Sequence, residues 1–421
     1  MPELYWPGKA TPTPVPAQLN TESFIYPQGS GYPSDIYRNR LLWGDNLAAM
    51  WALLAEYEGQ IDLIYADPPF YSNRHYPARI GRVEDSRRPD KWRLAEGYPD
   101  HWPDLDAYLD MLYPRVVLMH RLLSPTGSLY LHLDWHANAY ARLILDEIFG
   151  PERLLNEIVW VYHGPSPIRS AFNRKHDTIL AYTRGSKYTF NVDDIRTPYD
   201  PSTVKTFESS RKAGFGKVPD LARGQVPEDW WYFPVVARLH NERTGYPTQK
   251  PEALLERIIL ASSNPGDMVA DFFCGSGTTP VVAARHGRRF LAVDKTWRAV
   301  HTTRTRLLQV SDLPFCIQGV NQAGKLPEGV TDLSEQARDG CEFDPRKGQV
   351  YLNLESFPEL DYWEVDPAWD GRVFRSFTQA IRPRRKGNVP HSLTLTQTSD
   401  IQQICVRLMG VNGEQFQTMI E

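Results

Sequence analysis

Apolar and polar positions along the chain alternate in the way that successive strands and helices produce. Residues 61–67 form a nearly continuous apolar run, which is typical of a strand covered by helices on both faces. Ahead of it, a short strand signal within residues 37–43 gives way at residues 44–46 to a helical period over residues 47–54. The pattern predicts a strand, a helix and a buried strand in succession.

The same alternation continues in two later blocks of the chain. Strands are predicted at residues 127–134, 176–184, 268–273 and 288–294, and amphipathic helices at 138–150, 251–263 and 278–287. Strands and helices that follow one another in this way predict an α/β fold with a mostly parallel sheet and right-handed crossovers.

Three stretches depart from this alternation. The N-terminal stretch is rich in Pro, Thr, Gly and Ser, so we expect an extended arm rather than a packed element. Residues 191–244 have no clear period, which is typical of an insertion that carries partner-specific contacts. The C-terminal stretch has only short strand signals. The predicted domains are an arm at 1–34, an α/β domain at 35–310 and a small β-rich domain at 311–421, with the insertion between the halves 35–190 and 245–310.

Composition and charge narrow the class of protein. The chain has 421 residues, of which 41% are hydrophobic, enough for a sizeable buried core. Lys and Arg number 47 against 51 for Asp and Glu, which gives a net charge of −4. Overall charge therefore does not favour a polyanionic partner, and any surface for nucleic acid must be local.

Cysteine usage and hydropathy point to the compartment. The four cysteines lie far apart and form no CxxC pair, which disfavours a zinc site and a disulfide framework. No apolar run reaches the ~20 residues of a membrane span, and the first residues lack the apolar core of a secretion signal. We therefore expect reduced thiols, no membrane partner and a cytoplasmic location.

Candidate chemistry first emerges in "DFFCGSGTT", residues 271–279, at the end of a predicted strand. Its two glycines, spaced one apart, permit a tight turn whose backbone N–H groups and following helix face a ligand. An ordinary strand-to-helix turn explains a lone GxG about as well. Pro280 replaces the third glycine of the dinucleotide fingerprint, and no GK[ST] triplet of a P-loop follows.

The next predicted strand ends in Asp294, about 20 residues beyond the start of the glycine turn. At that spacing an acid can bind the ribose hydroxyls of a nucleoside that lies across the strand ends, although it could also be a solvated carboxylate. A turn that cradles a ligand and a ribose-binding acid together indicate an adenosine-containing cofactor that needs no phosphate. S-adenosylmethionine fits these terms.

The segment "DPPF", residues 67–70, follows the buried strand. Its residue types suit the transfer of a methyl group from that cofactor to an exocyclic amine. Methylation of an exocyclic amine requires acceptors for both N–H groups, so that the nitrogen lone pair points at the methyl. Asp67 is one acceptor, the carbonyl of Pro68 is a second with restricted dihedrals, and Phe70 offers a face for a planar base. Asp-Pro-Pro also simply ends a strand, but the downstream glycine turn favours the chemical interpretation.

Together, "DPPF", "DFFCGSGTT" and "YPTQKPEALLERII" resemble the amino-methyltransferases of DNA, in their beta class, where the catalytic motif precedes the cofactor motif. The likeness covers residues 40–308 and includes "LSPTGSLYLHLD" and "LLNEIVWVYH". It implies a Rossmann-like methyltransferase fold with permuted motif order, a small β-rich C-terminal appendage outside it, and S-adenosylmethionine as cofactor.

The resemblance also implies roles for individual residues. Catalytic positions are Asp67, Pro68, Pro69 and Phe70, with Phe in place of the commoner Tyr at position 70. Cofactor-binding positions are Asp45 near the adenine, Asp271, Phe273, Gly275, Gly277 and Thr278 in the turn, Asp294 at the ribose, and Thr248, Gln249, Lys250 and Pro251 as the methionine-side motif. Transfer would be direct and in line, with no cysteine nucleophile, so Cys274 is expected to be a packing residue. The target base would have to flip out of the duplex.

Double-stranded DNA, the implied partner, requires local positive charge and side chains that read bases. Candidates in the insertion are Lys205, Arg211, Lys212, Lys217 and Arg223, followed in sequence by Trp230, Trp231 and Tyr232. A solvated loop with an aromatic anchor on the core explains the two tryptophans at least as well. A second basic cluster comprises Arg382, Arg384, Arg385 and Lys386, and charge runs are usually only solvated.

The acceptor base is not fixed by these motifs alone. Family members with Asp at the first motif position usually act on adenine N6 and those with Ser on cytosine N4, so adenine is favoured and cytosine stays the main alternative. A non-catalytic DNA-binding subunit is a third interpretation, disfavoured because every expected motif position is filled. A homodimer and a separate restriction or defence partner stay open, in a prokaryotic or phage-like setting on the nucleoid.

Overall fold

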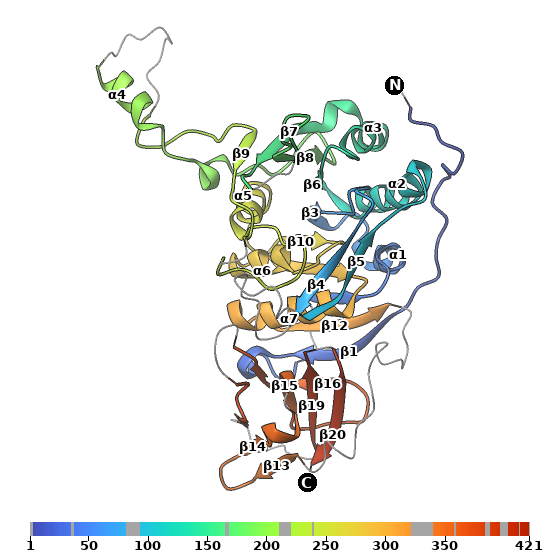
Figure 1. Ribbon diagram of the computed structural model, residues 1–421, viewed down its shortest axis with the longest axis vertical. Coiled ribbons are helices and arrows are strands. Elements are labelled where there is room, and N and C mark those ends of the chain that lie inside the picture. Colours follow the sequence, from blue (N-terminus) through green and yellow to red (C-terminus); the bar gives the residue numbers. More distant parts are fainter. Residues whose placement is uncertain are drawn as a thin grey trace.

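An 11-stranded sheet with helices on both faces forms the body of the protein in the computed structural model (Figure 1). The structure describes residues 3–34, 38–80, 93–164, 168–209, 220–237, 240–320, 340–357, 359–383, 388–395, 403–411 and 413–420. The strands of the large sheet lie in the order β16 (Phe374–Ser376), β1 (Leu19–Ile25), β12 (Phe315–Val320), β2 (Arg40–Trp43), β11 (Arg289–Asp294), β10 (Met268–Asp271), β3 (Ile61–Ala66), β6 (Leu123–Leu133), β8 (His176–Thr183), β7 (Leu154–Val161) and β9 (Trp230–Tyr232).

The centre of this sheet is parallel, as the sequence predicts. The strands β12, β2, β11, β10, β3 and β6 pair in parallel, one with the next. β8 is antiparallel to β6 and to β7, while β9 is parallel to β7. Because two reversals restore the direction, the carboxyl end of β7 lies at the same edge as the carboxyl ends of the parallel strands. The predicted mostly parallel methyltransferase-like fold is confirmed.

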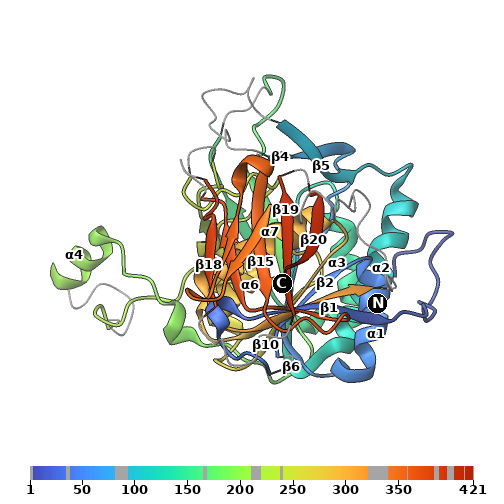
Figure 2. The same cartoon turned by 90° about the horizontal axis from the view of Figure 1, so that it is seen from below.

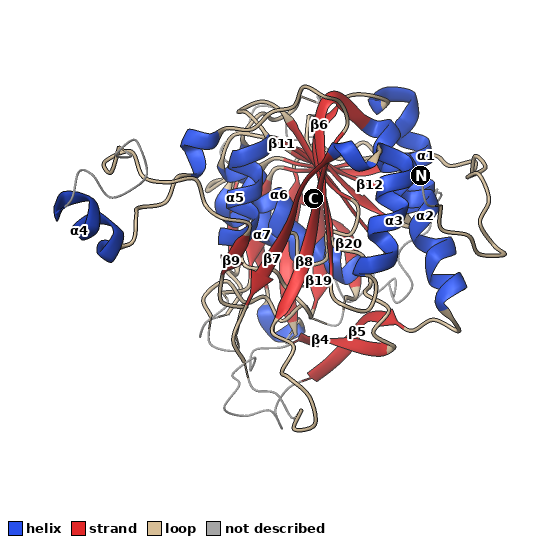
Figure 3. Cartoon of the chain, turned by 90° about the horizontal axis from the view of Figure 1, so that it is seen from above, coloured by secondary structure: helices blue, strands red, loops and turns tan. Residues whose placement is uncertain are grey.

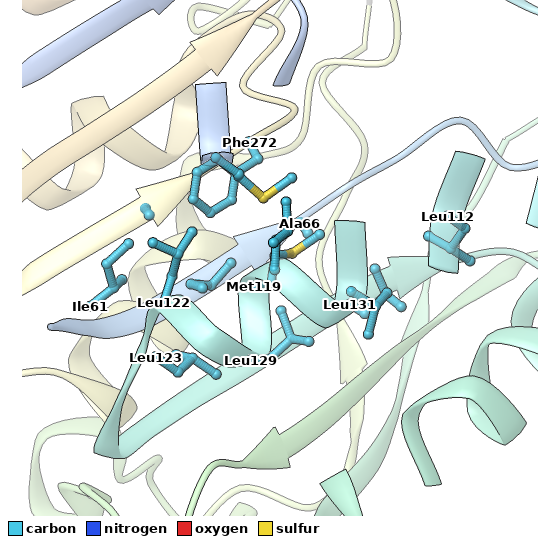
Figure 4. Packing of buried hydrophobic residues seen from close by; sticks show 14 of the residues in the cluster. Ile61, Ala66, Leu112, Met119, Leu122, Leu123, Leu129, Leu131 and Phe272 are labelled. Carbon is cyan, nitrogen blue, oxygen red and sulfur yellow. The ribbon is translucent and has the colours of Figure 1, made fainter. Parts of the chain in front are cut away.

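Helices cover both faces of the sheet because each presents an apolar stripe to it (Figure 3). On one face lie α1 (Asn46–Tyr57), α2 (Leu105–Leu122) and α3 (Asn138–Phe149), and on the other lie α5 (Glu252–Ser262), α6 (Thr278–Arg285) and α7 (Trp297–Val310). Figure 4 shows the first of these cores, where Met119 and Leu122 of α2 pack among Ile61 of β3 and Leu129 of β6. No described helix is both long and apolar enough to cross a membrane.

The N-terminal segment differs from the extended arm that its composition predicts. β1 lies inside the large sheet between β12 and β16, and the Trp6 side chain is only 3% exposed, with its indole N–H donated to Asp110 at 2.6 Å. β12 also joins the sheet, so the α/β body extends to Val320, beyond the predicted boundary at residue 310. Both differences arise from pairing with distant strands, which local composition does not reveal.

The C-terminal part forms the small β-rich domain that the sequence predicts (Figure 1). One sheet contains β13 (Cys341–Asp344), β14 (Gln349–Leu352) and β18 (Ser392–Thr394), and another contains β17 (Thr378–Ile381), β15 (Leu360–Asp366), β19 (Ile404–Gly410) and β20 (Gln415–Ile420). These sheets share a core of their own that includes Val350, Trp363 and Leu408.

Two further features lie outside the large sheet. The insertion contains η4 (Val192–Ile195) and α4 (Pro201–Ser209), and α4 projects far from the body (Figure 1). β4 (Arg74–Ile80) and β5 (Arg93–Asp100) form a separate hairpin that follows the carboxyl end of β3 (Figure 2). Short 3-10 helices lie at η1 (Pro27–Gly29), η3 (Pro151–Arg153) and η5 (Leu354–Ser356).

Candidate active site at the carboxyl edge of the sheet

Acidic residues stand where the parallel strands end. Asp271 and Asp294 are the last residues of β10 and β11, Asp67 directly follows β3, and Asp45 lies two residues beyond β2. Parallel strands present their carboxyl ends at one edge of the sheet, where open α/β folds bind ligands. All four side chains line a single cavity of about 300 Å³ at this edge. Motifs more than 200 residues apart in sequence therefore meet in one site.

The glycine turn between β10 and α6 requires its two glycines. Gly275 and Gly277 have φ values of 49° and 75°, in the left-handed region that side chains disfavour. A Cβ on Gly277 would lie 2.4 Å from Oγ1 of Thr303, and one on Gly275 would lie 3.1 Å from the Tyr246 ring. Thr278 begins α6 and donates its hydroxyl to the Lys250 carbonyl at 3.2 Å, which ties the turn to the segment before α5.

Asp271 shapes this turn from within. Its Oδ1 accepts the backbone N–H of Phe273 at 2.9 Å, and its Oδ2 accepts the hydroxyl of Thr279 at 2.5 Å. Burial raises the pKa of Asp271 to about 7, although both hydrogen bonds act in the opposite direction. The carboxyl group therefore holds the turn together at the floor of the cavity.

Asp294 connects its own strand end to the glycine turn. One carboxylate oxygen accepts the Gly275 N–H at 2.9 Å, and the other accepts the N–H and hydroxyl of Thr296 at 2.9 and 3.0 Å. Burial raises the pKa of Asp294 above its ordinary value. The group lines the cavity, and the oxygen that accepts only the Gly275 N–H retains a lone pair for a ligand hydroxyl.

Asp45 belongs to a network that the sequence did not reveal. It caps α1 by accepting the N–H groups of Leu47 and Ala48 at 3.0 and 3.2 Å. Arg115 of α2 donates to Asp45 at 3.1 Å and to Asn46 at 2.6 Å. Burial lowers the pKa of Arg115, which lines the cavity beside both partners. Only tertiary packing brings α2 to this point, so no local motif marks Arg115.

Asp67 has one paired and one unpaired oxygen. The Lys250 ammonium contacts Oδ2, and Lys250 also lies 5.3 Å from the centre of the Phe70 ring. Oδ1 is buried and has no hydrogen-bond partner among the described residues. A buried acceptor without a partner is costly unless a ligand supplies the donor. This oxygen is therefore the best candidate for binding a substrate N–H.

Asp100, at the end of β5, fixes the chain that follows the two prolines. Its carboxylate is only 1% exposed and accepts the backbone N–H groups of Phe70, Tyr71 and Ser72 at 3.1, 2.9 and 2.8 Å. Tyr71 has a φ of 65°, a strained value for a non-glycine residue that these bonds hold in place. No local motif marks Asp100, because its partners lie 28 to 30 residues earlier.

A buried polar chain lies behind Phe70, whose ring stacks on His132 of β6 with centroids 5.8 Å apart. The two ring nitrogens of His132 contact the Tyr65 hydroxyl at 2.7 Å and Asp177 at 3.3 Å. Burial acts to raise the pKa of Asp177, but hydrogen bonds from His132 and Tyr162 hold it below its ordinary value. The chain fixes the orientation of the ring on which Phe70 rests.

Residues before α5 close the cavity opposite the strand ends. Thr248, with a φ of 54°, meets the Tyr98 hydroxyl at 2.9 Å. Gln249 accepts the Thr244 N–H at 2.9 Å and donates to the Glu242 carbonyl at 2.8 Å, so its amide mainly fixes its own loop. The structure thus places the predicted methionine-side motif against the predicted cofactor turn.

Most of the predicted site residues meet in this cavity. Its lining includes Asp45, Asp67, Pro69, Thr248, Gln249, Lys250, Asp271, Phe273, Gly275, Thr278 and Asp294. Pro68, Phe70, Gly277 and Pro251 adjoin these positions in sequence but do not line it. The Pro69 carbonyl serves the fold rather than a ligand, since it accepts the Tyr108 hydroxyl at 2.9 Å. Cys274 is buried and its thiol pKa lies well above the ordinary value because of that burial, as befits a packing residue.

The structure describes Lys205, Arg223 and Arg382 among the predicted DNA-binding residues. Lys205 is exposed on the projecting α4, whereas Arg223 is paired with Asp193 at 2.8 Å. Arg382 is paired with Asp361 at 2.8 Å. Arg211, Lys212 and Lys217, like Arg384, Arg385 and Lys386, lie outside the described residues.

The aromatic residues of the insertion divide between core and surface. Trp231 is 8% exposed and packs in the core, while Trp230 and Tyr232 are 60% and 51% exposed. Trp231 therefore matches the predicted aromatic anchor, and its two neighbours stay available for contacts.

Known proteins match a large part of this chain. A DNA methylase family model matches residues 61–305. The DNA adenine methyltransferase YhdJ of Escherichia coli K12 is 32% identical over 256 residues, which cover 60% of this chain and 77% of YhdJ. The type II methyltransferase M.BglII of Bacillus subtilis is 31% identical over 272 residues, 63% of this chain and 67% of M.BglII. A solved DNA modification methylase of Thermus thermophilus is 21% identical, covers 67% of this chain and 99% of its own, and has a TM-score of 0.42.

Proposed function

Because the chain belongs to the N6/N4 family of DNA methylases, we propose that it methylates the N6 amine of adenine in duplex DNA. The protein is an S-adenosylmethionine-dependent DNA methyltransferase, and the proposal adds the acceptor base. Asp rather than Ser at position 67 and the likeness to a relative named as an adenine methyltransferase both support adenine.

The residues of the cavity fit the cofactor. Its adenosine would lie between Asp45 and Asp294, over the glycine turn that a Cβ would obstruct, and its methionine part would face Thr248 and Lys250. When bound, S-adenosylmethionine supplies a methyl group that its sulfonium makes electrophilic. Four carboxyl groups around the cavity suit a ligand that carries hydroxyls and positive charge.

The unpaired Asp67 Oδ1 is the observation that carries the proposal. It can accept one N–H of an exocyclic amine, while the Pro68 carbonyl is the candidate acceptor for the other. Two such bonds localise the nitrogen lone pair and aim it at the incoming methyl group, so that positioning and electrostatics lower the barrier. Asp67 would take up the proton that the amine loses when it accepts the methyl group of the bound cofactor.

The target base must leave the duplex to reach this buried carboxylate. Phe70, held in place by Asp100 and supported by His132, then offers a face against which the flipped base can stack. Asp67 binds the exocyclic amine and not the ring of the base. The same pocket can therefore accept adenine or cytosine. Choice of base therefore needs a direct measurement.

The test is to incubate the protein with S-adenosylmethionine and mixed-sequence duplex DNA, digest the DNA, and identify methylated nucleosides by mass spectrometry. N6-methyladenine from the unaltered protein, and none from Asp67→Ala, is the expected result. N4-methylcytosine would keep the mechanism and overturn the choice of base. Cofactor binding with no methylated product would favour a non-catalytic DNA-binding subunit.

The proposal also extends to partners and setting. We expect the enzyme to act on bacterial or phage DNA in the cytoplasm, as a single chain or a homodimer, beside any separate restriction or defence partner. The mass of the purified protein in solution, compared with 48.3 kDa for one chain, decides between the first two arrangements.

A further inference from the structure

The chain between β7 and β8 emerges at the same edge of the sheet as the candidate active site. Val161, the last residue of β7, pairs with His176, and Leu133 at the end of β6 pairs with Thr178. Residues 168–175 therefore lie beyond the carboxyl ends of the parallel strands, the edge where Asp67 and Asp271 stand. In Figure 2 this green segment extends past the edge of the sheet, on the side of the β4–β5 hairpin.

Phe172 in this segment is 97% exposed, more than any other large hydrophobic side chain described. Exposure of a phenyl ring to water is unfavourable, and exposed rings that gather with polar residues on one surface mark interaction sites. Arg169 and Arg174, both exposed, lie three residues before it and two after it. The guanidinium of Arg174 lies 4.1 Å from the ring centre of Trp135, which lies in the turn after β6 and is 51% exposed.

Exposed aromatic rings continue along the edge on the other side of this segment. Tyr232 of β9 pairs with Val161, is 51% exposed, and lies 5.2 Å from the His163 ring. Trp230, two residues earlier on the same face of the strand, is 60% exposed. The edge therefore combines exposed rings with cations in a protein of net charge −4.

This combination fits a nucleic acid better than an apolar protein surface. Cations contact phosphates, and exposed rings stack on bases or enter between them. A purely apolar partner would leave Arg169 and Arg174 desolvated without a counter-charge. The position at the same edge of the sheet as the cavity also suits a duplex whose target base must reach Asp67.

We propose that Phe172 is a wedge that enters the base stack beside the flipped nucleotide while Arg169 and Arg174 contact the flanking phosphates. The inference rests on the proposed base-flipping function and names the surface that performs it. A ring in the vacated space keeps neighbouring bases stacked and slows the return of the target base. Its contribution should therefore be largest when the target base is paired and small when it is not.

Sequencing of DNA modified by the protein first identifies the site that it methylates. The first test then compares Phe172→Ala, Phe172→Trp and the unaltered protein on a duplex that contains this site. The matched control is Tyr5→Ala, which removes an 82% exposed ring far along the sequence from this edge. We expect Phe172→Ala to lower kcat/KM at least tenfold on the paired duplex and less than threefold when the target base faces an abasic site. Phe172→Trp should restore most of the activity. An equal loss on both duplexes, or no loss, would overturn the wedge.

The second test measures binding of a mixed-sequence duplex by fluorescence anisotropy and does not depend on methyl transfer. Arg169→Ala with Arg174→Ala should reduce the slope of log Kd against log salt by about two, since each phosphate contact contributes about 0.9. An unchanged slope would overturn the phosphate contacts. A protein that binds duplex through these arginines but methylates no base would contradict the proposed function and leave this surface standing.

Discussion

At the scale of single residues, the two oxygens of Asp67 meet different surroundings. Oδ2 is paired with the Lys250 ammonium, while Oδ1 is buried with no partner among the described residues. The Asp67 and Lys250 side chains are 17% and 9% exposed, so water screens the pair weakly. Loss of either partner would leave the other charged group buried and uncompensated.

We expect Lys250→Met to lower the free energy of unfolding by about 3 kcal/mol, because it leaves the Asp67 carboxylate buried without its cation. Adding Asp67→Asn should recover most of that loss of stability, while methyl transfer is lost because the Asp67 carboxylate is gone. Urea unfolding of the unaltered protein, both single variants and the double variant measures the coupling. Strictly additive losses would show that the two side chains do not interact in solution.

A second prediction at this scale concerns Asp100, whose carboxylate accepts three consecutive backbone N–H groups. Asn in its place offers a single acceptor oxygen, so the segment from Phe70 to Ser72 should lose its position. We expect Asp100→Asn to reduce kcat by about tenfold to a hundredfold, the range in which small misplacements of reacting groups act. The Kd for S-adenosylmethionine, measured by calorimetry, should change little.

Asp104→Asn is the matched control for that variant. Asp104 caps α2 by accepting the Ala107 N–H at 2.8 Å, and Asn caps a helix about as well as Asp. Its activity should therefore equal that of the unaltered protein. Equal kcat values for Asp100→Asn and the control would mean that the catalytic segment holds its position without the carboxylate.

At the scale of elements, the turn between β10 and α6 is constrained by both its backbone conformation and its neighbours. Gly277 needs its positive φ and has no room for a methyl group beside Thr303. Gly287 offers a comparison, because its φ is 71° but no atom of the described residues lies within 4 Å of a Cβ built there. A comparison of Gly277 with Gly287 therefore distinguishes the effect of backbone strain from the effect of steric obstruction.

We expect Gly287→Ala to cost about 1 kcal/mol of stability through backbone strain alone and to leave cofactor binding unchanged. Gly277→Ala should cost clearly more and should weaken binding of S-adenosylmethionine at least tenfold, because Thr303 or the turn must move. Thermal unfolding and calorimetric titration measure the two effects. Similar Kd values in both variants would show that the turn does not shape the cofactor site.

The elements that the sequence predicted well are those whose signals are local. Predicted helices at 251–263 and 278–287 correspond to α5 and α6, and the glycine turn lies where its motif places it. A strand end, a turn and a helix cap are each determined by a few consecutive residues, so their chemistry can be identified without the fold. Parallel pairing then brings those ends to one edge.

What the sequence did not reveal depends on distant contacts. Arg115, Asp100 and His132 each serve partners that lie 28 or more residues away in the chain. The sequence pattern does not predict β1, because "LNTESFI" contains several polar residues and forms a strand by pairing with the distant β12. In the three-residue strand β9, no period was long enough to show that Trp231 faces the core while Trp230 faces solvent.

At the scale of the whole molecule, buried charges join the α/β body to the C-terminal domain. Arg304 of α7 and Glu364 of β15 are both fully buried and lie 3.6 Å apart, and the Tyr362 hydroxyl donates to Glu364 at 2.6 Å. Nearby, His301 of the same helix contacts Asp361 at 3.0 Å. β16 also extends the large sheet beside β1. A domain held through fully buried ionic groups should not move independently of the helix that it covers.

The unaltered protein should therefore unfold in one calorimetric transition that includes both domains. Glu364→Gln keeps the shape of the side chain but leaves Arg304 buried without its counter-charge, so we expect stability to fall by about 3 to 5 kcal/mol. If the domains are coupled, the same change should also weaken S-adenosylmethionine binding, because Thr303 beside Gly277 precedes Arg304 on α7. Two transitions in the unaltered protein, or a Glu364→Gln effect confined to the second of them, would show that the C-terminal domain stands apart from the catalytic body.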